Sequence, residues 1–145
     1  MQIITRQVKD KPLTVTIEYP EYNESVTALV RKISSMDIGF SASMDGHRIR
    51  VSLSDVYYIE NVERKLFIYT AGEVYRLDLS MSEVEAMTAD TDLVRISRTC
   101  LMNTDHLKEI RQVKNSRLEA VLDNDEMLIV SRKYLKDIKK VFQKG

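Results

Sequence analysis

The chain has 145 residues, of which 43% are hydrophobic and 30% are charged, so it is long enough for one domain with a modest core. Its 22 basic and 22 acidic residues cancel, and this neutrality argues mildly against nucleic-acid binding, because affinity for phosphates comes largely from released counterions. The single cysteine excludes an internal disulfide, which fits a reducing cytoplasm. We expect no signal peptide and no membrane span, because the apolar runs are too short.

Charge is unevenly distributed along this neutral chain. Residues 93–117 and 131–145 are predominantly basic, whereas the acidic excess lies before Leu93. A basic end that is balanced by an acidic front can present one positive face to an anionic partner.

Residues 1–50 are predicted to form a small β-β-α-β unit. The two strands are expected at 3–8 and 13–19, the second because apolar and polar residues alternate along it. A helix capped by Asn23 or Ser25 should follow, because four apolar residues then fall at spacings of i, i+3, i+4 and i+7. These residues are Val26, Leu29, Val30 and Ile33.

The unit should end in a strand over residues 38–44. Asp45-Gly46 then predicts a tight hairpin that returns the chain through residues 48–53. No chemical motif is present in this unit. It either packs on the main domain or mediates dimer formation, and the sequence leaves both alternatives open.

The main body, from about residue 51, is predicted to consist of short strands joined by turns. The expected strands cover residues 56–60, 65–70, 74–79, 117–122 and 126–130. Ser80 and Glu83 have the spacing of a capping box, which predicts a short helix after the third of these strands. An amphipathic helix with one basic face, capped by Ser131, is predicted to close the chain.

The segment 93–111, which reads LVRISRTCLMNTDHLKEIR, carries the most informative pattern. It predicts a strand, an apolar run and then a polar turn at Asn103-Thr104-Asp105. The strand should expose Arg95, Ser97 and Arg98, and arginine and hydroxyl groups together suit a nucleic-acid duplex. On local grounds alone, an ordinary hairpin with solvated arginines is the simpler interpretation.

Residues 95–103, which read RISRTCLMN, resemble the signature of the LytTR-type DNA-binding domain of bacterial response regulators. The resemblance continues at residues 55–60, which match the opening strand of that family, and at residues 130–136, which match its closing segment. In total it covers about residues 51–142. The family usually has an aromatic residue, a histidine and an aromatic residue at the positions of Leu93, Ser97 and Cys100.

The resemblance implies a mainly β fold of the α+β class, with elongated antiparallel sheets and short helices over residues 51–145. It implies that loops between strands reach successive major grooves and bend the duplex. The base contacts it implies come from Arg64 or Lys65, Arg98 and Arg132. The phosphate contacts it implies come from Ser97, Thr99, Arg117 and Lys133.

The front unit is too short for a receiver domain, so the chain resembles the stand-alone LytTR regulators of Gram-positive bacteria. The resemblance implies a cytoplasmic transcriptional regulator whose partner is double-stranded DNA. We expect a homodimer on repeated half-sites, and the resemblance implies a small membrane protein that restrains the regulator. The alternative is a protein-interaction module that meets a membrane or an acidic partner through residues 1–50 and the basic face.

Catalytic chemistry has little support in the sequence, and we expect neither an enzyme nor a cofactor. Cys100 lies in an apolar run and is predicted to be a buried small hydrophobe. His47 and His106 are expected at the surface, and their spacing from the cysteine does not form a metal site.

Overall fold

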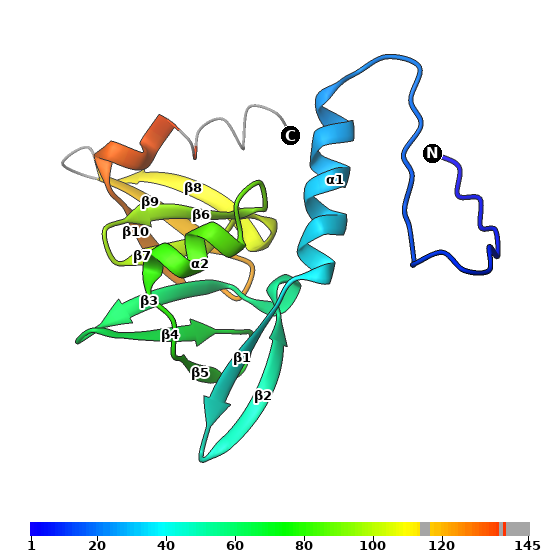
Figure 1. The fold of residues 1–145 in the computed structure, drawn as a ribbon. Coiled ribbons are helices and arrows are strands. Elements are labelled where there is room, and N and C mark those ends of the chain that lie inside the picture. Colours follow the sequence, from blue (N-terminus) through cyan, green and yellow to red (C-terminus); the bar gives the residue numbers. More distant parts are fainter. Residues whose placement is uncertain (114–116, 137, 139–145) are drawn as a thin grey trace.

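The structure, a computed structural model, describes residues 1–113, 117–136 and 138, and most of the strands lie in two antiparallel sheets (Figure 1). The large sheet has the strand order β2-β1-β5-β4-β3-β7-β6, and the small sheet has the order β10-β9-β8. The expectation of a mainly β fold with short helices is confirmed.

The elements of the large sheet are β1 (Gly39–Met44), β2 (His47–Ser52), β3 (Tyr58–Val62), β4 (Lys65–Tyr69), β5 (Val74–Leu77), β6 (Leu93–Ser97) and β7 (Cys100–Asn103). Those of the small sheet are β8 (Leu107–Val113), β9 (Arg117–Leu122) and β10 (Met127–Val130). The α-helices among the described residues are α1 (Glu24–Asp37) and α2 (Met81–Met87). Short 3-10 turns are η1 (Leu53–Asp55), η2 (Thr104–His106) and η4 (Arg132–Tyr134).

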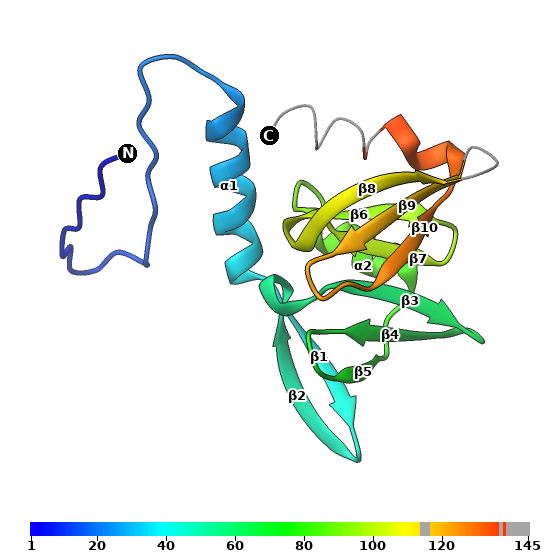
Figure 2. The ribbon, with the colours of Figure 1, turned by 180° about the vertical axis from the view of Figure 1, so that it is seen from behind.

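The helix α1 begins where the sequence predicts it. The side-chain oxygen of Asn23 accepts from the backbone N–H groups of Ser25, at 2.9 Å, and Val26, at 3.3 Å, which satisfies two donors of the first turn. The strands expected at 3–8 and 13–19 are not formed, and residues 1–22 lie on the far side of α1 from the sheets (Figures 1 and 2). A strand requires a neighbouring strand for its hydrogen bonds, and neither segment has one.

Two hairpins of the large sheet have two-residue turns in the left-handed backbone region. Asp45 and Gly46 have φ values of 49° and 80° between β1 and β2, as the sequence predicts. Glu63 and Arg64 have φ values of 52° and 68° between β3 and β4, although neither is a glycine. The first hairpin belongs to the large sheet, because Ala42 of β1 pairs with Leu77 of β5.

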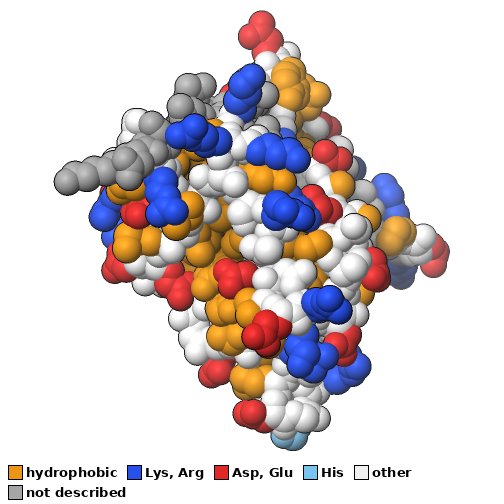
Figure 3. All heavy atoms as spheres, turned by 90° about the vertical axis from the view of Figure 1, so that its left-hand side faces the viewer, with side chains coloured by type: hydrophobic (Ala, Val, Ile, Leu, Met, Phe, Trp, Pro, Cys, Tyr) orange, Lys and Arg blue, Asp and Glu red, His pale blue; other side chains and the backbone are white. Residues whose placement is uncertain are grey.

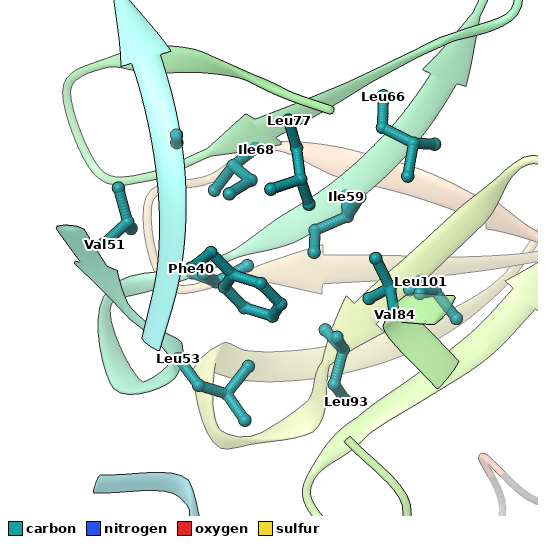
Figure 4. Close-up of a cluster of buried hydrophobic side chains, with 12 residues drawn as sticks. Phe40, Val51, Leu53, Ile59, Leu66, Ile68, Leu77, Val84, Leu93 and Leu101 are labelled. Atoms are coloured by element: carbon teal, nitrogen blue, oxygen red, sulfur yellow. The ribbon is translucent and has the colours of Figure 1, made fainter. Parts of the chain in front are cut away.

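Two separate clusters of buried side chains stabilise the fold, and each such side chain contributes about 1.5–3 kcal/mol by leaving water. One cluster fills the space between the large sheet and α2 (Figure 4). Its fully buried members include Phe40, Leu53, Val56, Ile59, Ile68, Val84 and Leu101. The other joins β6 and β7 to the small sheet and includes Ile96, Met102, Ala120, Leu122 and Ile138.

The predicted capping box positions α2 over the first cluster. Ser80 Oγ accepts from the backbone N–H of Glu83 at 3.1 Å, and the Glu83 carboxylate accepts from the N–H of Ser80 at 3.3 Å. Val84 then points into the core with no exposed surface.

Asn103 fixes the exit from β7. Its side chain is buried, and its amide nitrogen donates to the carbonyls of Leu53, at 3.2 Å, and Val56, at 2.8 Å. Its amide oxygen accepts from the N–H of Asp105 at 3.0 Å, which forms the polar turn that the sequence predicts.

Candidate functional site

The structure brings the sequence-predicted site residues to one end of the molecule. They lie on the β3–β4 turn, the β6–β7 turn, the first residue of β9 and the start of η4, all on the left of Figure 1. We call this set the basic end, and its members are Arg64, Lys65, Ser97, Arg98, Thr99, Arg117, Arg132 and Lys133. Figure 3 views this side of the molecule and shows many Lys and Arg side chains on it, with acidic and apolar groups between them.

Backbone hydrogen bonds between distant parts of the chain hold these tips together. The N–H of Asn61 donates to the carbonyl of Thr99 at 2.8 Å, which joins the β3–β4 hairpin to the β6–β7 turn. The N–H of Ser131 donates to the carbonyl of Ile96 at 2.8 Å, which joins the start of η4 to β6. Leu118 pairs with both neighbours of β9, so Arg117 lies beside the end of β10.

The β3–β4 turn presents Arg64 and Lys65 to solvent. Both residues are exposed, and Arg64 is held in the left-handed region, where a side chain costs about 1–2 kcal/mol. Glu63 precedes it in the same region, so the tip of this hairpin keeps two non-glycine residues in a strained conformation.

The β6–β7 turn exposes Arg98, and side-chain hydrogen bonds from neighbouring residues stabilise its backbone. Ser97 Oγ accepts from the N–H of Thr99 at 3.3 Å. Arg95 donates from one terminal nitrogen to the carbonyl of Arg98, at 3.2 Å, and from the other to the carboxylate of Glu85 on α2, at 2.7 Å. Arg95 therefore positions the turn, and the exposed guanidinium is that of Arg98.

The start of η4 presents Arg132 and Lys133, which are both exposed. The ammonium group of Lys133 lies 5.6 Å from the centre of the Tyr134 ring, which is within the range of a cation–π contact. The expectation that the Ser131 side chain caps a helix here is wrong, because its hydroxyl makes no capping hydrogen bond. Its carbonyl instead accepts from the N–H of Tyr134 at 2.9 Å, which closes a 3-10 turn. Most of the predicted terminal helix lies outside the described residues.

The cations of the basic end differ in their partners from the paired cations of β8. Within residues 1–113, 117–136 and 138, none of the six forms an ion pair. On β8, by contrast, Lys108 lies 2.9 Å from Asp125, and Arg111 pairs with Glu109. The hydrogen bond from Asp125 raises the pKa of Lys108 above its ordinary value. Within the part of the chain that the structure describes, no carboxylate pairs with these cations, and all six are exposed to solvent.

Cys100 is a buried hydrophobe, as the sequence predicts. It is 5% exposed, and burial raises the pKa of its thiol to about 12. Among the described residues, no group of three His, Cys, Asp or Glu side chains is arranged to hold a metal ion. In the same part of the chain, no helix has the length and hydropathy needed to cross a bilayer.

His106 was expected at the surface, but the structure places it between the two sheets. Its ring stacks on Tyr57 with the centroids 4.0 Å apart, and Nε2 donates to the carbonyl of Ser54 at 2.8 Å. Nδ1 lies 3.2 Å from the carboxylate of Asp123. These partners are distant in sequence, and no local pattern marks them.

Comparison with protein families assigns the sheets described above. Residues 46–143 match the family described as "LytTr DNA-binding domain". A solved LytTr DNA-binding domain from Bacillus cereus superposes with a TM-score of 0.66 over 72% of this chain and 95% of that structure. Its sequence identity is 23%, so this likeness concerns the fold.

Several bacterial regulators are similar in sequence. The sensory transduction protein LytT of Enterococcus faecalis is 28% identical over 89 residues, which are 61% of this chain and 37% of that protein. LytT of Bacillus subtilis is 20% identical over 97% of this chain and 59% of that protein. An uncharacterized HTH-type transcriptional regulator of Staphylococcus aureus is 22% identical over 86% of both chains. This chain thus spans 37% to 59% of the length of these two LytT relatives.

Proposed function

Because the chain belongs to the LytTr DNA-binding domain family, we propose that it is a sequence-specific regulator of transcription whose basic end reads the major groove. The observation that carries this proposal is the gathering of six exposed cations that form no ion pair with any described residue, on tips connected by backbone hydrogen bonds. Such a surface attracts the phosphate backbone and presents side chains to base edges.

Base reading is assigned to exposed cations of the β3–β4 turn, the β6–β7 turn and the start of η4. These are Arg98, Arg132 and either Arg64 or Lys65. Arginine forms a bidentate pair with guanine, which contributes about 1–3 kcal/mol of discrimination against other bases.

Phosphate contacts are assigned to two hydroxyl residues and two cations of the basic end that lie beside the base-reading residues. These are Ser97, Thr99, Arg117 and Lys133. Hydroxyl groups and cations beside the base-reading tips fix the register of the protein on the duplex without reading sequence.

The positions of the helices support reading by turns. The helix α1 lies on the opposite side of the molecule from the basic end (Figure 1), and α2 has seven residues that cover the first core cluster. Among the described α-helices, neither presents a basic face at this end.

We further propose that the protein acts as a homodimer on repeated half-sites in the cytoplasm. A small membrane protein that restrains it stays a prediction.

The test is selection of bound duplexes from a random pool, followed by titration of the recovered site with variants. Arg98→Ala and Arg132→Ala should each weaken binding to that site about tenfold or more, which corresponds to 1.4 kcal/mol, while circular dichroism stays unchanged. Lys32→Ala is the matched control, because Lys32 is an exposed cation on α1. Failure to enrich any duplex would contradict the proposed function, and wild-type affinity in both variants would contradict the assigned residues.

A further inference from the structure

Among the described residues, neither the segment 13–19 nor the outer edge of β2 is hydrogen-bonded to a neighbouring strand. We propose that residues 13–19 of one copy add as a strand to β2 of a second copy, and that this reciprocal exchange forms the homodimer. The inference deepens the proposed function, since it names the surface of the proposed dimer, but the exchange itself does not require DNA.

The segment 13–19 has the pattern of a strand but lies outside both sheets. In an extended chain, its apolar residues fall on one side, and two threonines and Glu18 fall on the other. Leu13 is 100% exposed, Val15 is 59% exposed and Tyr19 is 49% exposed. An amphipathic strand with its apolar side in water needs a sheet edge to cover it.

The strand β2 supplies an open edge, because it is the last strand of the large sheet and β1 is its one strand neighbour in the described part of the chain. Its hairpin has a two-residue turn, so Met44 and His47 form the hydrogen-bonded pair next to the turn. Alternate residues then direct their backbone N–H and C=O groups away from β1. Arg48, Arg50 and Ser52 are the residues of β2 whose backbone groups face the open edge.

The two faces of β2 match the two sides of the segment. Val51 is 5% exposed and Ile49 packs against the core, so an added strand would place its apolar side beside them. A hollow of about 360 Å³ opens here and is lined partly by Ile49, Val51 and Tyr75, which leaves room for an apolar side chain.

Charge favours the same alignment. The opposite face of β2 carries Arg48 and Arg50, and Glu18 would lie on that face of the added strand. Arg50 pairs with no carboxylate of the described residues and only donates to the carbonyl of Asp37 at 3.4 Å. Arg48 lies 3.9 Å from Asp78, a long and exposed contact. The lengths agree too, since seven added residues span about 23 Å and the six residues of β2 about 20 Å.

The position of α1 favours a second copy over the same copy. This helix has 14 residues and is therefore about 21 Å long, and only its C-terminal end joins the large sheet. The chain leaves the other end of α1 and turns back beside the helix, so residues 13–19 lie on the far side of α1 from the sheets (Figures 1 and 2). Tyr19 can lie at most about 18 Å from Glu24, which is less than the length of α1, so the connection is too short to bring the segment to β2 of the same copy. In a two-fold dimer, each copy contributes one strand and one edge, which closes the assembly.

The test is sedimentation equilibrium of the full chain without DNA. We expect a dimer with a micromolar or tighter dissociation constant, and Val15→Lys should give a monomer with unchanged circular dichroism. Glu18→Arg and Arg50→Glu should each raise the dissociation constant about tenfold, and the two changes combined should restore the dimer. Glu21→Arg is the matched control, because it makes the same charge change beyond Pro20.

A wild-type chain that stays monomeric at about 100 µM would overturn the exchange. So would a dimer that Val15→Lys and both charge changes leave intact, because it would use another surface. The monomeric Val15→Lys variant should still bind a duplex with a single half-site. Loss of half-site binding by an intact dimer would contradict the proposed function alone, whereas a monomeric wild type that binds half-sites would contradict the exchange alone.

Discussion

The backbone N–H of Ser131 donates to the carbonyl of Ile96 at 2.8 Å, and this bond joins the small sheet to the large sheet beside the basic end. Arg98 lies two residues beyond Ile96, and Arg132 follows Ser131 directly. The backbone segments that carry these two cations, the β6–β7 turn and the start of η4, are therefore held side by side by a main-chain hydrogen bond. Substitution of either side chain should leave this arrangement in place, so their contributions can be measured separately.

Arg117 should contribute through phosphate contacts. Arg117→Ala is expected to weaken binding to the selected site and to random duplex by similar factors, and to reduce the slope of log affinity against log salt by about 0.9. Fluorescence anisotropy titrations at several salt concentrations measure both quantities. Arg132→Ala should instead lower the ratio of selected to random affinity. An Arg117→Ala variant that alters only this ratio would show that Arg117 reads bases.

Arg64 combines a strained backbone with a cation. Arg64→Gly should stabilise the fold by about 0.5–1 kcal/mol, because φ of 68° is free of strain for glycine, and should weaken binding to DNA. Arg64→Ala removes the same cation without relieving the backbone, so it should weaken binding equally but not stabilise. Urea unfolding and duplex titration of both variants provide the measurement. Equal stability of the two variants would argue against strain at this turn.

Asn103 should be essential to stability. Asn103→Ala removes the side-chain donor to the carbonyl of Val56 and one of the two donors to the carbonyl of Leu53, which also accepts from the N–H of Val56. The unfolding free energy should therefore fall by about 2–4 kcal/mol. The urea midpoint should fall with little change in slope. Asn124→Ala is the control, because that side chain accepts a single exposed hydrogen bond from Glu126, at 3.1 Å. A loss no larger than that of the control would contradict the role of Asn103.

Asp123 should make stability depend on acid pH. The hydrogen bond from Tyr57, with a smaller one from His106, holds the pKa of this carboxyl below its ordinary value of 3.8. The unfolded chain then takes up the proton more readily, so the stabilisation is complete above the ordinary pKa and is lost as the pH falls through the lowered one. Asp123→Asn should therefore destabilise at neutral pH, and its difference from wild type should shrink as the pH falls below the ordinary pKa of 3.8 and through the lowered one. A difference that grows on acidification would reverse this sign.

The sequence predicted those parts of the fold that depend on contacts within a few residues. The cap at Asn23, the capping box of Ser80 and Glu83, and the turn at Asp45-Gly46 each use side-chain or backbone geometry that is local. The alternation along residues 13–19 is equally clear, but a strand also needs a neighbour, and periodicity does not supply one.

The position of the basic end could not be predicted from local sequence patterns, because it is formed by contacts between distant residues. The bonds from Asn61 to Thr99 and from Ser131 to Ile96 connect residues far apart in sequence, so only the family resemblance grouped the tips before the structure did. The role of His106 was missed for the same reason. The sequence could not decide whether Arg95 holds the turn or contacts a phosphate. Its position in the strand does not reveal that its guanidinium donates to Glu85 and to the Arg98 carbonyl.

The two core clusters contain none of the side chains of the basic end. Mutations at the tips therefore leave most of the folding free energy untouched, whereas mutations in the clusters affect every function of the chain. After gene duplication, such a scaffold can diverge in the operators it recognises while its interior stays under constant selection. For the same reason, exchanging whole tips between paralogues offers a practical route to regulators with new target promoters.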